Sequence, residues 1–186
     1  MLKDLTIQPK GGISQLSLKL GLNTFREVCD HLLHLPYRRP FGKTSKAVLD
    51  EGCGTCSSKH GVLKAIAVEQ GLEEIELVLC LFRMTAKNTP AIKKMLAEGP
   101  LLRIPEAHTY IRWGDEKIDV TKPGLHILNM QSDVLKEQVI SLEELSQKSE
   151  IHQEWMEQWL NINHPEVALT SAWQQREACI TALGQT

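Results

Sequence analysis

The stretch EAHTYIRWGDEKIDVT, residues 106–121, alternates in a way that predicts the two strands of a β-hairpin. The first strand would present two different faces, one with Ala107, Thr109, Ile111 and Trp113 and the other with Glu106, His108, Tyr110 and Arg112. Ile118 and Val120 of the second strand must join the apolar face, because a slip of one residue would move both to the polar side. A two-residue Gly-Asp turn gives a register that meets this condition.

This register brings two functional side chains together. Tyr110 lies opposite Asp119, and His108 is the diagonal neighbour of Asp119 on the same face, within side-chain reach. An imidazole oriented by a carboxylate is the pair that a cysteine nucleophile needs, because the histidine takes the thiol proton and the aspartate steadies the imidazolium. We therefore expect a hydrogen bond between His108 and the Asp119 carboxylate.

Upstream of the hairpin, the segment EGCGTCSSKHG, residues 51–61, supplies two cysteines ahead of a mostly apolar helix pattern. If Thr55 caps that helix, Cys56 is its first residue, where the macrodipole and free N–H groups stabilise a thiolate. The same N–H groups supply part of an oxyanion hole. Cys53 lacks this position, and we expect it to be a buried spectator.

Two other chemistries use a Cys-x-x-Cys pair, and they are weaker alternatives here. A redox dithiol should follow a β-strand, whereas SKAVLDEG precedes this pair and has a poor strand pattern. A zinc site needs a second pair of ligands, and no other close pair of cysteine or histidine follows at finger-like spacing. We therefore expect no metal site and no organic cofactor.

The rest of the chain predicts a single α+β domain over residues 1–186, with a core at about 45–125 and C-terminal helices at about 141–184. The helix patterns cover residues 23–35, 57–71, 89–99 and 170–184, and a capping box at Ser141 and Glu144 opens a further helical region. The β-prone run of residues 74–84 predicts a buried strand.

These residues together resemble the transglutaminase-like superfamily of papain-fold cysteine enzymes. The resemblance rests on a Gly-x-Cys that opens a buried helix, a strand, and then His-Thr-Tyr and Asp-Val-Thr on a hairpin, and it covers about residues 50–122. It implies a central helix packed on an antiparallel sheet, with Cys56 as nucleophile and His108 and Asp119 as its partners. Asp50 stands where papain-like enzymes have a glutamine, so the second oxyanion donor is unassigned.

The resemblance implies thiol-dependent hydrolysis or transfer of an acyl group from an amide or peptide substrate, with the acceptor left open between water and an amine. A non-catalytic binding domain of the same fold is the rival interpretation. We expect substrate contacts from His60, one helical turn after Cys56, and from Tyr110. The basic loop before the cysteines predicts contacts to an anionic group, through Arg38, Arg39, Lys43 and Lys46.

The composition is that of a globular protein, with 42% hydrophobic and 24% charged residues among 186. No apolar run is long enough to span a membrane, and the N-terminal MLKDLTIQPKGG lacks the apolar segment of a signal peptide. These features predict a cytoplasmic protein. A net charge of −2 predicts no binding to nucleic acid or to membrane surfaces, and the oligomeric state is left open.

Overall fold

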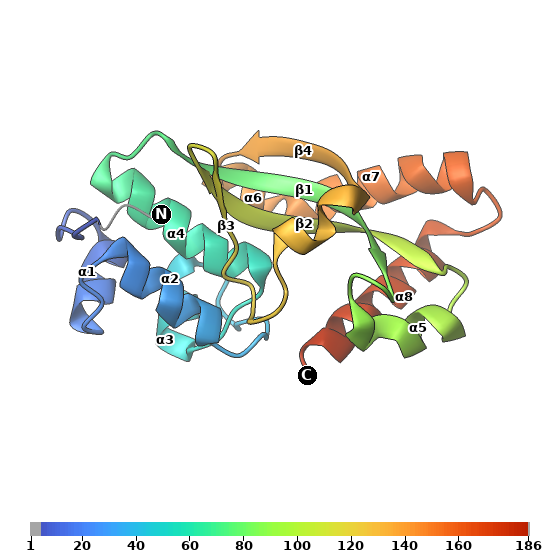
Figure 1. Ribbon diagram of the computed structural model, residues 1–186, viewed down its shortest axis with the longest axis horizontal. Coiled ribbons are helices and arrows are strands. Elements are labelled where there is room, and N and C mark those ends of the chain that lie inside the picture. Colours follow the sequence, from blue (N-terminus) through green and yellow to red (C-terminus); the bar gives the residue numbers. More distant parts are fainter. Residues whose placement is uncertain (1–4, 186) are drawn as a thin grey trace.

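The structure of the protein, a computed structural model, describes residues 5–185 and has an α+β architecture (Figure 1). The helices before the sheet are α1 Gly12–Lys19, α2 Phe25–His34, α3 Ser45–Glu51 and α4 Cys56–Gln70. The strands are β1 Ile75–Thr85, β2 Arg103–Trp113, β3 Glu116–Ile118 and β4 Val134–Ile140, with the 3-10 helices η1 Pro90–Ile92 and η2 Ile127–Asp133 between them. The later α-helices are α5 Lys93–Glu98, α6 Leu142–Ser146, α7 Lys148–Asn163 and α8 Leu169–Leu183.

The four strands form one antiparallel sheet in the order β3-β2-β1-β4. Strands β1 and β2 pair along their whole length, from Ile75 opposite Trp113 to Thr85 opposite Arg103. Strand β4 covers the other edge of β1, with an irregularity in register between Leu81 and Phe82. The α+β expectation is therefore confirmed, with a sheet that is antiparallel throughout the described residues.

The hairpin has the register expected from its pattern, although its second strand is shorter. Ile111 pairs with Ile118 and Trp113 pairs with Glu116, so the next pair along would join Tyr110 and Asp119. Gly114, with φ of 60°, takes the left-handed conformation that a tight hairpin turn requires. Strand β3 ends at Ile118, so Asp119 lies just beyond the strand and not within it as the sequence suggested.

Both faces of the two long strands β1 and β2 are buried, so the polar face around His108 does not lie on the protein surface as its alternation suggested. The α4 side of the sheet carries Leu77, Leu79, Leu81, Ala107 and Ile111. The opposite side carries Val78, Cys80, Phe82 and Tyr110 and is covered by apolar residues of α5, α7, α8 and the two 3-10 helices. Glu106 and His108 are 5% and 4% exposed, so the site lies inside the protein. Apolar and polar residues do alternate along β2, but a second layer of helices covers the polar face of this strand.

Helix α4 begins and ends where its sequence predicts. Ser58 Oγ accepts a hydrogen bond from the N–H of Thr55, the N-cap residue, and Gly71 ends the helix in the left-handed conformation. The buried face of α4 packs on β1 and β2, and each fully buried Leu or Ile contributes about 1.5–3 kcal/mol. This packing fixes the first turn of the helix, with Cys56, close to His108 on β2.

Figure 1 shows α1 to α4 gathered at one end of the molecule and α5, α7 and α8 at the other, with the sheet running between them. Four elements had no counterpart in the sequence analysis: α1, the short helix α3 capped by Thr44, the 3-10 helix η2, and β4. No helix within residues 5–185 has the length and apolar character needed to cross a membrane.

Candidate active site

Cys56, His108 and Asp119 lie next to one another in that order, with the His108 ring between the thiol and the carboxylate. His108 Nε2 lies 2.8 Å from Asp119 Oδ2, which is the contact expected from the hairpin register. The His108 ring also lies next to the Cys56 side chain, close enough for each to favour the charged form of the other. Because Nε2 is taken by the carboxylate, Nδ1 is the ring nitrogen that remains for the sulfur. The three residues come from the start of α4, from β2 and from the segment after β3.

The Asp119 carboxylate is held by four donors, which fix its orientation. Its Oδ1 accepts from the Thr121 N–H at 3.1 Å and from the Thr121 hydroxyl at 2.6 Å. Its Oδ2 accepts from the Ile127 N–H at 2.9 Å in addition to His108. A buried carboxylate with every acceptor used stays ionised, because the hydrogen bonds favour the charged form. Burial alone would raise the pKa of Asp119, but the positive charge of His108 and these bonds lower it far below its usual value.

The charges of the site favour a thiolate beside an imidazolium. Burial disfavours a thiolate at Cys56, but the Lys148 ammonium and the neighbouring His108 ring lower the pKa of the thiol well below its ordinary value. Burial likewise disfavours the charged form of His108, but the Asp119 carboxylate raises the pKa of the imidazole to about 10. The pair therefore exists as thiolate and imidazolium around neutral pH, which is the reactive form of a cysteine nucleophile.

His60 holds the first turn of α4 in place and does not face the pocket beside Cys56. Its Nε2 accepts from the Val120 N–H at 2.9 Å, so its Nδ1 carries the proton and donates to the Cys56 carbonyl at 2.7 Å. Burial lowers the pKa of His60 to about 4, so the ring is neutral. Lys59 adds a second link, since its ammonium donates to the carbonyls of Leu35 and Thr121. His60 is thus a positioning residue, and its position does not support the expected substrate contact.

Tyr110 also lies away from any substrate path. Its side chain is fully buried on the face of the sheet opposite α4, and its hydroxyl donates to Glu137 Oε1 at 2.9 Å. Lys117 lies over the tyrosine ring and bonds the same carboxylate at 2.8 Å. This network ties β2 to β4 across the sheet. The sequence suggested that Tyr110 contacts the substrate, whereas its hydroxyl contacts Glu137 and holds the sheet together.

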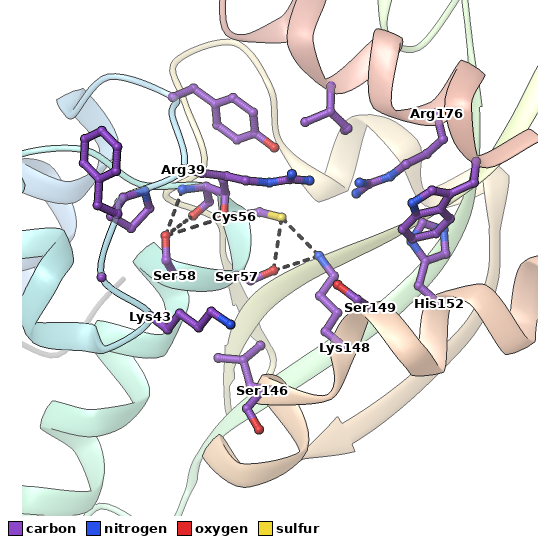
Figure 2. A pocket seen from close by; sticks show the side chains of 18 residues that line it. Arg39, Lys43, Cys56, Ser57, Ser58, Ser146, Lys148, Ser149, His152 and Arg176 are labelled. Atoms are coloured by element: carbon purple, nitrogen blue, oxygen red, sulfur yellow. Dashed lines mark hydrogen bonds between the residues drawn. The ribbon is translucent and has the colours of Figure 1, made fainter. Parts of the chain in front are cut away.

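A pocket of about 330 Å³ opens beside Cys56. Its walls come from four parts of the chain: the loop 37–43, the start of α4, the junction of α6 and α7, and one side of α8. Figure 2 shows Arg39, Lys43, Lys148 and Arg176 around the space next to the sulfur. Arg39 therefore lies where the sequence suggested. Arg38 instead lines a neighbouring pocket, and Lys46 pairs with Asp50 on α3.

Lys148 is the functional residue that sequence reasoning missed. It is the first residue of α7, and its Nζ lies 3.5 Å from Cys56 Sγ and 2.8 Å from Ser57 Oγ (Figure 2). A cation at the first position of a helix opposes the macrodipole, so this lysine does not stabilise its own helix. That conflict was the one signal available in the sequence. It could not be used because the boundary between α6 and α7 carries no strong cap.

A buried ion pair forms the back wall of the pocket. Arg176 on α8 donates from Nε and Nη2 to the two oxygens of Glu106, at 2.7 and 2.6 Å, and from Nη1 to Glu177 at 2.6 Å. Arg39 donates to the same Glu177 from the opposite side, at 3.1 Å. The bidentate geometry joins α8 to β2 next to His108 and gives this wall a fixed shape.

The other cysteines have environments unlike that of Cys56. Burial raises the pKa of Cys29 and of Cys80 to about 12, and that of Cys179 to about 11. Cys53 is fully buried, and none of the five cysteines forms a disulfide. Within residues 5–185, no three side chains of the types His, Cys, Asp and Glu are grouped so as to hold a metal ion. Cys56 alone combines a lowered thiol pKa with an opening to the pocket.

Comparisons with protein-family models, with curated proteins and with solved structures give no match to this chain.

Proposed function

We propose that this protein is a cysteine-dependent amidase, peptidase or acyltransferase that uses Cys56, His108 and Asp119 as a catalytic triad. The observation that carries the proposal is the arrangement of three side chains at the start of a helix and beside a pocket: His108 is hydrogen-bonded to Asp119 and lies next to Cys56. Three unrelated structural residues would have no reason to combine an oriented imidazole, an activated thiol and an opening to solvent.

In the first half of the proposed reaction, the Cys56 thiolate attacks the carbonyl carbon of an amide. The C–S bond forms while the carbonyl oxygen takes up negative charge. Free N–H groups in the first turn of α4 face that charge, and the Lys148 ammonium supplies a second donor where no glutamine is available. The His108 imidazolium then gives its proton to the leaving nitrogen, the C–N bond breaks, and an amine departs.

In the second half, the thioester on Cys56 is resolved by an acceptor. Neutral His108 takes a proton from water or from an amine as that acceptor attacks the thioester carbonyl. The C–S bond breaks, the acyl product leaves, and the cycle returns to thiolate and imidazolium. Asp119 keeps the ring in one orientation and stabilises its positive charge in both halves. Hydrolysis and transfer differ only in the acceptor.

We also propose that the fold is of the transglutaminase-like, papain-type kind. The supporting features are a nucleophile at the start of a helix that packs on an antiparallel sheet, and a histidine and an aspartate that follow on a hairpin in that chain order. The C-terminal helices α7 and α8 cover the site from the other side. Five unpaired thiols suit a reducing compartment, so we propose a cytoplasmic location.

The test is alkylation by iodoacetamide across a range of pH, followed by peptide mapping of the labelled cysteine. We expect Cys56 to react below neutral pH, and we expect the other four cysteines to stay unlabelled in the folded protein. Hydrolysis of 4-nitrophenyl acetate gives a parallel measure of acylation, and Cys56→Ala should abolish both signals. Labelling of Cys56 only near the ordinary thiol pKa of about 8.5 would contradict the proposal and favour a non-catalytic domain.

A further inference from the structure

The pocket beside Cys56 has an unbalanced set of charges. Its lining includes Arg39, Lys43, Lys148 and Arg176 but no aspartate or glutamate, as far as the described residues go. Hydroxyl groups make up much of the remaining polar lining, from Thr55, Ser57, Ser58, Ser146 and Ser149. In Figure 2 the four cationic side chains extend toward the space beside the sulfur from different sides. Such a lining attracts anions and repels cations.

Two of the four cations are already neutralised. Arg176 is paired with Glu106 and Glu177, and Arg39 is paired with Glu177. Two carboxylates therefore balance these two guanidinium groups. The resulting ion pairs form one wall of the pocket. A pocket containing only these pairs would show no preference between an anionic and a neutral ligand.

The other two cations have no such balance. Within residues 5–185, neither Lys43 nor Lys148 has a carboxylate partner, and the neighbours of the Lys148 ammonium are Cys56 Sγ and Ser57 Oγ. Lys46, on the adjacent helix α3, provides a contrast, because its ammonium pairs with Asp50 and it does not line the pocket. The Lys148 ammonium is balanced by the Cys56 thiolate that it contacts, so the Lys43 ammonium is the positive charge that remains available to a ligand.

We infer that the substrate carries an anionic group within a few atoms of the carbonyl that Cys56 attacks. The inference rests on the proposed function and narrows it to a class of acyl donor, one whose carboxylate or phosphate is bound in the cationic pocket. Lys148 faces the reacting carbonyl, and Lys43, on the loop across the pocket, faces the anionic substituent. An uncharged acyl donor would leave the Lys43 ammonium without a counter-charge, so the pocket discriminates against it.

The test compares two alkylating agents of almost equal size, iodoacetate and iodoacetamide, on Cys56. In both reactions the thiolate forms a C–S bond and expels iodide, so the ratio of the two rate constants cancels the fraction of thiolate. A free thiol such as N-acetylcysteine gives the reference ratio, in which iodoacetate is disfavoured by its charge. We expect the ratio on Cys56 to exceed the reference by about tenfold, the lower end of what a charged cleft produces, and to fall as salt is added.

Variants locate the effect within the pocket. Lys43→Met should lower the ratio of the iodoacetate rate to the iodoacetamide rate severalfold. Lys46→Met is the matched control, because it removes one positive charge outside the pocket. A ratio at or below the reference in the unmodified protein would overturn the inference, and so would equal effects of the two variants. The proposed function is judged separately by the pH dependence of iodoacetamide alone. If Cys56 is labelled rapidly at low pH but shows no preference for iodoacetate, the proposed triad is supported and the inference of an anionic substrate is wrong.

A protection experiment separates the two sources of negative charge. Glutarate and inorganic phosphate are added at equal ionic strength while Cys56 is labelled with iodoacetamide. Stronger protection by glutarate assigns a carboxylate-bearing acyl donor, and stronger protection by phosphate assigns a phosphorylated one. Lys43→Met should weaken the protection in either case, whereas the absence of protection by both anions would contradict the inference.

Discussion

The two sides of Cys56 differ in how completely their polar groups are satisfied. On the hairpin side, Asp119 accepts four hydrogen bonds and both nitrogens of His60 have partners, all of them buried. On the pocket side, neither Lys43 nor Lys148 has a carboxylate partner within residues 5–185, and Lys43 lines the open space of the pocket. The difference separates two tasks, because a fully paired network fixes geometry whereas unpaired charge at an opening is available to a ligand.

The largest expected effect comes from the satisfied side. Asp119→Asn should lower kcat/KM for 4-nitrophenyl acetate by about 10³-fold or more, because the amide cannot stabilise the imidazolium. It should also lower the free energy of unfolding by about 1–3 kcal/mol, because an NH₂ group would face N–H or hydroxyl donors that now bond a carboxylate. Thr121→Val, which removes a single bond to Asp119, is the milder control. An Asp119→Asn variant that kept a tenth of the activity would show that the carboxylate is not needed.

The second effect concerns His60 and is measured as the dependence of the free energy of unfolding on pH. Its pKa in the folded protein is about 4, while the unfolded chain binds the proton at about 6.5. As the pH falls through this window the unfolded state gains a proton that the folded state does not, so stability should decrease by about 2–3 kcal/mol between pH 6.5 and 4. Urea unfolding of His60→Gln should show a smaller slope over that window. Substitution of the exposed His34 by Gln serves as the control, and equal slopes for all three proteins would contradict the neutral, buried ring.

The third effect belongs to the pocket side. The pH–rate profile should be bell-shaped, with limbs that report the coupled ionisations of Cys56 and His108. Lys148→Met removes the cation next to the sulfur, so the pKa of the thiol rises and the acid limb should move up by about one pH unit. Activity would then fall most steeply on the acid side of the profile, and a smaller loss at pH 8 would reflect the missing oxyanion donor. Lys148→Arg should leave the acid limb where it is. An acid limb that does not move in Lys148→Met would show that Lys148 has no effect on the pKa of the thiol.

The smallest effect is expected at Cys53. This thiol is fully buried close to Cys56 in sequence but is not at the start of the helix. Cys53→Ala should change the rate of iodoacetamide labelling by less than about twofold and cost about 1 kcal/mol of stability, the usual result of a small cavity. If Cys53→Ala and Cys56→Ala lost activity equally, the two cysteines would be acting as a dithiol.

The parts of the site that depend on local pattern could be predicted from the sequence. Alternation in residues 106–121 fixes the hairpin register, and with it the contact between His108 and Asp119. The cap residues around Cys56 and Gly71 give the limits of α4. Both features follow from neighbours within a few residues, where sterics and hydrogen bonding act directly.

The parts that depend on distant segments could not be predicted. Lys148 reaches Cys56 from 92 residues away, and nothing in the local sequence reports that contact. Strand β4 was missed because only its last residue, Ile140, is buried, so it has no alternating apolar pattern. The burial of Tyr110 could not be predicted either, because the apolar cluster that contains it includes residues of α7, α8 and η2, which are distant in the sequence.

The position of Lys148 at the start of α7 has a consequence for the order of events during synthesis. A chain made from its N-terminus completes Cys56, His108 and Asp119 well before Lys148 and the helices that wall the pocket. The sulfur on the nascent chain therefore lacks the Lys148 ammonium, which lowers the pKa of its thiol in the finished protein. The full reactivity proposed for Cys56 depends on the last quarter of the protein, which supplies both this charge and the helices that wall the pocket.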